Sequence, residues 1–131
     1  MKEKIICKYG IDIHGIIDKH TFIPPLMEAL VTSGHEVHVI TGSEDGPRIL
    51  NYLNSFGVYP SYHYTHFFSI SSHLMDEGYP VTFDNNNPFF DDALWNKTKG
   101  EYCARNNIDF MLDDSDVYGK FFTTPYAQMK G

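Results

Sequence analysis

The sequence predicts an α/β protein with a parallel sheet covered by helices on both faces. Short apolar runs alternate along the chain with segments of helical periodicity. The first run, KIICKYGIDI, has the near-continuous apolar character of a strand that is buried on both faces. The stretches between the runs are long enough for right-handed helical crossovers. With 131 residues, we expect a single domain over 1–131.

The first half of the chain predicts two strands, each followed by a helix. Pro24 suits only the first turn of a helix, and Gly34 suits the position just after its end. Asp45 is a candidate N-cap for the next helix, with Pro47 in the first turn and Gly57 at the end. The expected elements are strands over about 4–13 and 35–41 and helices over about 22–33 and 46–56.

The second half predicts two further strands and a long loop. SYHYTHFF is rich in β-forming residues, and IDFML precedes the acidic run DDSD. Asp91 or Asp92 is a candidate cap for a longer helix that ends near Asn106. The expected elements are strands over 61–68 and 108–112, helices over 69–78 and about 92–106, a loop over 79–92 with a β-excursion at 80–83, and an edge strand over 120–124, before Pro125.

Composition restricts the classes of partner. The formal net charge is −7 and no cluster of Lys and Arg occurs, so nonspecific nucleic-acid binding is not expected. No stretch approaches the roughly 20 apolar residues that span a bilayer, and lysines interrupt the first apolar run. Cys7 and Cys103 are far apart and form no CxxC, so we expect buried free thiols in a reducing compartment. These features favour a cytoplasmic protein without a membrane segment.

Polar side chains follow three of the predicted strands at the point where each strand ends. Asp12 ends the first, Thr41 the second, and Asp113 with Asp114 the fourth. Ligands of parallel sheets bind outside the carboxyl ends of the strands, so neighbouring strands would bring these groups into one crevice. Carboxylates that share a crevice repel each other unless a cation lies among them, and hard oxygen ligands suit Mg²⁺.

Three motifs in this order resemble those of the haloacid dehalogenase (HAD) superfamily of phosphohydrolases. IDIHGII (11–17) resembles the first motif, an apolar strand followed by Asp-x-Asp-x-(Thr/Val). VITG (39–42) resembles the second, and LDDSD (112–116) resembles the fourth. The resemblance implies a three-layer Rossmann-like parallel sheet. The segment 15–21 is too short for a large cap domain, and the loop 79–92 could serve as a small lid over a sugar or a base.

The resemblance also implies roles for single residues. Asp12 would be the nucleophile of an aspartyl-phosphate mechanism, and Thr41 would hydrogen-bond the phosphoryl group. Lys99 would neutralise charge beside the phosphate, with Lys97 as a close rival because the third motif has no fixed spacing. The Mg²⁺ ligands would be Asp12, the backbone carbonyl of His14, Asp114 directly and Asp113 in support.

This chain departs from the family pattern at His14. Hydrolases of the family usually carry a second Asp there as general acid and base, and histidine titrates near neutrality and could do the same proton work. Three activities stay open: a hydrolase with a histidine acid/base, a slow or specialised phosphotransferase, and a catalytically degenerate module that binds a phosphorylated ligand or a protein. A response-regulator-like receiver is disfavoured, because the third strand ends in HFFSI and not in Asp.

The expected reaction is Mg²⁺-dependent hydrolysis of a small phosphate monoester, with nucleotides as one substrate class by analogy alone. The other histidines are not expected to bind zinc. His35 and His38 are three residues apart in one predicted strand and therefore point to opposite faces, as do His63 and His66. Assembly into a homo-oligomer stays open.

Overall fold

The computed structural model describes residues 5–85, 87–114 and 124–129. Five parallel strands form one sheet in the order β3-β2-β1-β6-β7, with β1 at its centre. The α/β class and the parallel sheet that the sequence predicts are confirmed. The strands are β1 (Lys8–Ile11), β2 (Glu36–Thr41), β3 (His66–Ser69), β6 (Phe110–Asp113) and β7 (Tyr126–Gln128).

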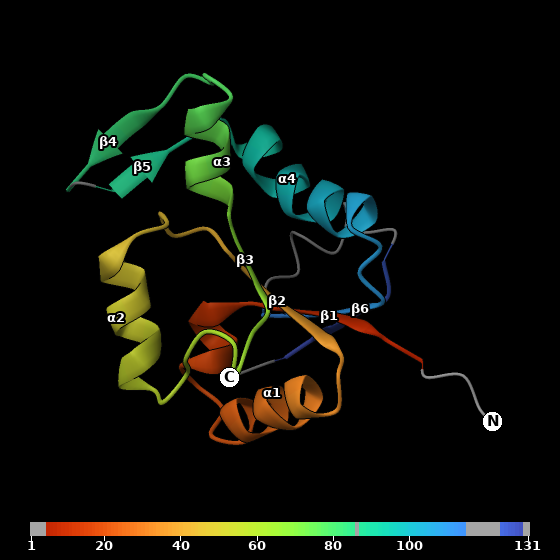
Figure 1. The fold of residues 1–131 in the computed structure, drawn as a ribbon. Helices are drawn as coiled ribbons and strands as arrows, with labels where there is room; N and C mark the ends of the chain where they lie inside the picture. Colours follow the sequence, from red (N-terminus) through yellow and green to blue (C-terminus); the bar gives the residue numbers. More distant parts are fainter. Residues whose placement is uncertain (1–4, 86, 115–123, 130–131) are drawn as a thin grey trace.

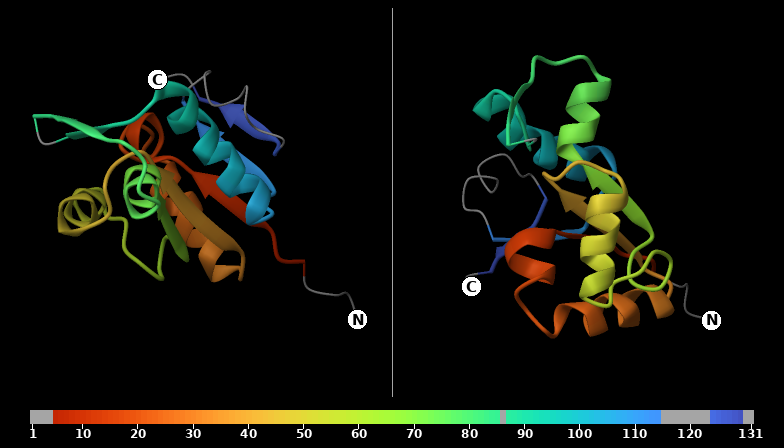
Figure 2. Two further views of the ribbon diagram at one scale, coloured as in Figure 1. Left: turned by 90° about the horizontal axis from the view of Figure 1, so that it is seen from above. Right: turned by 90° about the vertical axis from the view of Figure 1, so that its left-hand side faces the viewer.

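Helices cover both faces of this sheet (Figures 1 and 2). On one face, Met27 of α1 and Leu53 of α2 pack with Val37 and Val39 of β2. On the other face, Cys103 of α4 packs with Ile40 and Met111, and α3 lies beside α4. The helices are α1 (Ile23–Thr32), α2 (Pro47–Ser55), α3 (Ile70–Asp76) and α4 (Asp92–Arg105).

The strand order creates a switch point beside the central strand. From β1 the chain moves outward to β2 and β3, and then crosses back over the opposite face to β6, on the other side of β1. Successive connections therefore leave β1 and β6 in opposite directions, and the carboxyl ends of strands at such a point are where parallel sheets usually bind ligands. Asp12 follows β1 directly, and Asp113 ends β6, so both residues lie at this switch point.

A two-stranded hairpin occupies the segment that the sequence predicts as a loop with a β-excursion. Strands β4 (Thr82–Asp84) and β5 (Asn87–Phe89), which follow α3 and precede α4 in the sequence, pair antiparallel and extend away from the sheet (Figure 2). Phe83 and Phe89 are both exposed on it. In the part of the chain that the structure describes, this hairpin is the main addition to the α/β core.

Several predicted boundaries are wrong. The first strand begins at Lys8, and Ile5 and Ile6 are exposed, because no neighbouring strand extends far enough to pair with them. The third strand covers only His66–Ser69, because the residues before it form turns. The fourth predicted strand runs over Phe110–Asp113, two residues later at its start than expected.

The remaining corrections concern caps and single residues. Asp45 does not cap α2, since Gly46 occupies the N-cap without a side-chain hydrogen bond, whereas Asp91 caps α4 as expected. Cys103 is buried, but Cys7 is only half-buried, and both thiols are free. The predicted edge strand at 120–124 lies mostly outside the described residues, and β7 follows Pro125. None of the described helices is both long enough and apolar enough to cross a membrane.

Candidate functional site

Three carboxylates converge where β1 and β6 end. Asp12, Asp113 and Asp114 each offer one oxygen within 4.8 Å of the others. The backbone joins the two strand ends, because the Asp12 N–H donates to the Leu112 carbonyl over 3.1 Å. Asp12 and Asp113 are buried, whereas Asp114 is exposed. The cluster therefore has two buried carboxylates and is accessible to solvent on the side of Asp114.

A buried lysine compensates part of this negative charge. The ammonium of Lys99, on α4, lies 2.9 Å from Asp113 Oδ2 and 3.5 Å from Asp12 Oδ1, and its side chain is 1% exposed. Lys97, the rival in the sequence, is half exposed and pairs with Glu101 on the surface. Removing Lys99 would leave two buried carboxylates without this compensating charge, whereas Asp113 alone can still compensate Lys99 when Asp12 is neutral. The structure thus places Lys99, and not Lys97, in the acidic cluster.

The Asp12 carboxylate is harder to ionise than an ordinary aspartate. Burial raises its pKa to about 6; Lys99 acts in the opposite direction, and Asp113 adds to the rise. Its Oδ1 accepts a hydrogen bond from the Ile13 N–H over 2.9 Å. Within the described residues, the contacts of this carboxylate with Ile13 and Lys99 both involve Oδ1. Oδ2 is therefore the oxygen left for a ligand.

The turn that follows β1 brings the backbone close to the acidic cluster. This turn, η1 (Ile13–Ile17), is an irregular helical turn in which His14 and Gly15 leave helical geometry. Gly15 has φ +85°, and a Cβ at this position would overlap the Asp114 carboxylate. Glycine is required here both by the positive φ and by the close approach of the acid. The local structure therefore explains why position 15, directly after His14, is a glycine.

His14 is held by two polar side chains at the rim of the site. Its Nδ1 lies 3.1 Å from Asp18 Oδ2, and its Nε2 lies 3.1 Å from Ser43 Oγ. Ser43 in turn donates its backbone N–H to Thr41 Oγ1 over 3.2 Å, so His14 and the strand-end threonine belong to one network. The His14 side chain is 56% exposed, which leaves it accessible to a ligand.

Asp18 is fixed as a hydrogen-bond acceptor. Burial alone would raise its pKa, but hydrogen bonds from Tyr52, the Gly15 N–H and His14 outweigh burial and hold the pKa below its usual value. An ionised carboxylate on Nδ1 fixes the orientation of the His14 ring, as the third member of a catalytic triad fixes its histidine.

A cavity of about 820 Å³ opens beside His14. It lies along the first turns of α2, with Tyr52 and Arg48 on that helix and Pro88 of the β4–β5 hairpin on another side. Its lining is mixed, with acidic, basic, amide, hydroxyl and aromatic groups, so it suits a polar organic group. The hairpin thus contributes Pro88 to the cavity wall.

The donor set fits a hard divalent cation. Three carboxylates within 4.8 Å of one another are oxygen ligands of the kind that Mg²⁺ and Ca²⁺ select, and the exposed Asp114 leaves room for retained water. Asp12, Asp113, Asp114 and the backbone carbonyl of His14 are the groups that would hold it. A cation would also offset the repulsion that Lys99 alone leaves among three acids.

The sequence-predicted site residues therefore come together to a large extent. Asp12, Lys99, Asp113 and Asp114 form one cluster, and Thr41 is linked to His14 through Ser43. Ser43, Asp18 and Tyr52 were missed, although Asp18 follows His14 at the i+4 spacing that places two side chains together on a helical turn. Asp116, next to the acid pair, lies outside the described residues.

Comparisons with known proteins add no family to this geometry. No protein-family model matches the chain, and neither the curated proteins nor the solved structures include a significant match.

Asp12→Asn should stabilise the metal-free protein at neutral pH. The pKa of Asp12 is about 6 in the folded chain against 3.8 for an ordinary Asp, so ionising it costs stability as pH rises from about 4 to about 6. Above this range the cost is fully present, and we expect the unfolding free energy of Asp12→Asn to exceed that of wild type by about 1–3 kcal/mol. Urea denaturation in EDTA at pH 4, 6 and 8 measures it. The exposed Asp76→Asn is the matched control, and an equal pH dependence in wild type and Asp12→Asn would refute this assignment.

Proposed function

We propose that this protein is a Mg²⁺-dependent phosphohydrolase of the HAD type that cleaves a phosphate monoester through Asp12. The observation that carries the proposal is a cluster of three carboxylates at the switch point of a parallel sheet, two of which contact one buried lysine. A nucleophilic acid, a fixed cation and a candidate metal site are the parts that phosphoryl transfer through an aspartate requires.

Asp12 is the nucleophile of the proposed reaction. Oδ2 attacks phosphorus, a new P–O bond forms, and the bond to the leaving-group oxygen breaks to give an aspartyl-phosphate. The hydrogen bond from the Ile13 N–H to Oδ1 fixes the plane of the carboxylate, so that the attacking oxygen needs little reorganisation. Water then attacks the same phosphorus, inorganic phosphate leaves, and the Asp12 carboxylate is regenerated.

The surrounding charges stabilise the transferring phosphoryl group. The Lys99 ammonium is desolvated and already fixed by Asp113, so it acts as a preorganised positive charge beside the nucleophile. Thr41 ends the neighbouring strand β2 and offers its hydroxyl to a phosphoryl oxygen. Mg²⁺, when bound, would supply further neutralisation of the phosphate oxygens.

His14 is the general acid and base in this scheme. As imidazolium it gives its Nε2 proton to the leaving-group oxygen, and as imidazole it accepts a proton from the attacking water. Asp18 on Nδ1 orients the ring for both transfers, and Ser43 holds Nε2 in the resting site. The exposed ring lines the cavity, so the leaving group can reach it.

The cavity sets the class of leaving group that we expect. Its volume of about 820 Å³ accommodates an organic group well beyond the phosphate, and its lining carries both signs of charge. Tyr52 and the hairpin's Pro88 provide apolar surfaces, while Ser43 and Asn51 provide hydrogen-bonding groups. A nucleoside or sugar phosphate fits this lining better than a purely aliphatic one.

Asp12→Asn should abolish phosphate release while the fold is retained. We expect wild-type protein to release phosphate from members of a broad phosphomonoester panel only with Mg²⁺, and the variant to lose about 10³-fold or more of kcat. Full activity in Asp12→Asn, with Asp76→Asn as the surface control, would refute the nucleophile. A folded wild type that binds Mg²⁺ but hydrolyses no member of the panel would favour the degenerate binding module.

His14→Gln should lower kcat by about 10²–10⁴-fold on substrates with a poor leaving group, because their alkoxide must be protonated as it departs. The loss should be much smaller on nitrophenyl phosphate, whose leaving group needs no proton, and His14→Asp should restore part of the rate. Steady-state kinetics on an alkyl and a nitrophenyl ester measure both effects. Equal losses on the two esters would mean that His14 positions the site without transferring a proton.

A further inference from the structure

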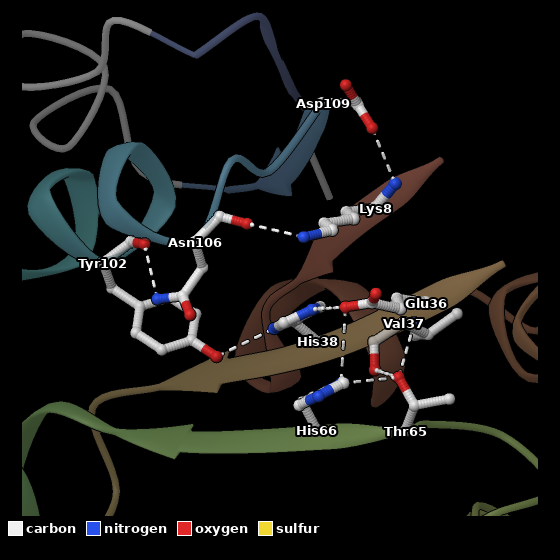
Figure 3. Close-up of polar contacts among 9 residues, drawn as sticks. All are labelled: Lys8, Glu36, Val37, His38, Thr65, His66, Tyr102, Asn106 and Asp109. Carbon is white, nitrogen blue, oxygen red and sulfur yellow. Dashed lines mark hydrogen bonds and ion pairs between the residues drawn. The ribbon is translucent and has the colours of Figure 1, made fainter. Parts of the chain in front are cut away.

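A second cluster of ligand side chains lies away from the acidic site. Glu36 and His38 belong to the amino-terminal half of β2, whereas Asp12 and Thr41 lie at the opposite, carboxyl ends of their strands. His66 begins β3 and is the direct register partner of His38. Strand alternation puts Glu36 and His38 on one face of the sheet, and the parallel register adds His66 to that face. Figure 3 shows the three side chains gathered beside Tyr102 of α4.

The ligand atoms are close enough to share one ion. His38 Nε2 lies 2.9 Å from Glu36 Oε1, and His66 Nδ1 lies 3.8 Å from the same oxygen. One ligand atom from each residue lies within 4.8 Å of the other two. The three residues also form a gradient of exposure, with side chains 3%, 31% and 50% exposed for His38, Glu36 and His66. The cluster therefore has one buried ligand, His38, and is open to solvent on the side of His66.

We propose that Glu36, His38 and His66 form a binding site for a transition-metal ion of the Zn²⁺ class. Two imidazoles and one carboxylate are a known ligand set of zinc sites in which the protein supplies three ligands. The fourth position is then left for water or another ligand. Imidazole nitrogen favours Zn²⁺, Ni²⁺ and Cu²⁺ over Mg²⁺, so the ion differs in chemistry from that expected at the acidic cluster.

The surroundings orient the buried ligand as metal sites require. The Tyr102 hydroxyl lies 2.8 Å from His38 Nδ1, which keeps Nε2 directed at Glu36. An outer hydrogen bond on the second ring nitrogen is the usual way in which proteins fix a metal-binding histidine. Burial also lowers the pKa of His38, and the hydrogen bond with His38 lowers the pKa of Glu36.

His66 is the ligand that must move. Its ring stacks on that of His38 with centroids 4.1 Å apart and planes 4° from parallel, so the lone pairs of the two rings do not yet converge. The His66 side chain is half exposed, and its Nδ1 contacts Thr65 Oγ1 over 2.8 Å. Metal binding would turn this ring out of the stack and would tie the edge strand β3 to β2.

Zn²⁺ titration of the full chain, first treated with a chelator, tests the proposal. Calorimetry should show a site that survives Asp114→Asn but loses about tenfold or more of its affinity in His66→Ala and in Glu36→Gln. Zn²⁺ should also raise the melting temperature of wild type by mass action. The control is His73→Ala, on α3, which should bind Zn²⁺ as wild type does.

Binding that disappears in Asp114→Asn, or that is unchanged in both His66→Ala and Glu36→Gln, would overturn the site. The absence of any Zn²⁺ binding by wild type would do the same. NMR of the histidine ring protons provides a second measurement, with Zn²⁺ expected to shift the His38 and His66 signals and to leave His73 in place. Mg²⁺-dependent phosphate release by His66→Ala should equal that of wild type, so this test and that of the proposed function fail independently.

Discussion

The contact between Lys99 and the two buried carboxylates is the interaction on which the rest of the site depends. A fully buried ammonium is costly unless it is paired, and Lys99 is compensated by Asp113 and Asp12 from two different strands. This pairing requires α4 to pack on the sheet with Lys99 facing inward, and it requires β1 and β6 to be neighbours. The helix, the strand order and the charge balance are therefore coupled.

This coupling has a cost in stability and a consequence for chemistry. Three acids around one lysine leave excess negative charge, and burial raises the pKa of Asp12 to about 6. A chain selected only for stability would have replaced Asp12 by a neutral or apolar residue, since buried ion networks are often no more stable than apolar packing. An unfavourable carboxylate at the switch point of the sheet is what a reactive group there would require.

The same fold separates two kinds of polar cluster. The carboxyl ends of β1 and β6 hold three carboxylates, against which α4 packs Lys99, whereas the amino-terminal half of β2 and the start of β3 hold two histidines and a glutamate. Hard oxygen ligands and imidazoles select different ions, so both clusters can coexist without competing for the same one. The first cluster lies at the switch point of the sheet, and the second ties an edge strand to its neighbour.

Much of the acidic site could be predicted from the sequence, because its residues directly follow apolar runs. Asp12, Thr41, Asp113 and Asp114 are marked by their strands, whereas the sequence leaves Lys99 and Lys97 as rivals, because both lie on one helix and only packing places Lys99 against the acids. The His38–His66 neighbourhood could not be predicted from spacing within one strand, because it arises from the register between β2 and β3. The late start of β1 and β3 likewise depends on which partner strands are available for pairing, which local propensity does not encode.

Chemical trapping of the aspartyl-phosphate is the most direct test of Asp12 as the nucleophile. Wild-type protein is mixed with Mg²⁺ and a phosphomonoester that it hydrolyses, quenched in acid, reduced with borohydride, digested and analysed by mass spectrometry. We expect the peptide containing Asp12 to carry homoserine at that position, because borohydride reduces an acyl phosphate and not a free carboxylate. Phosphate release without any modification of Asp12, or with the modification on another acid, would contradict it.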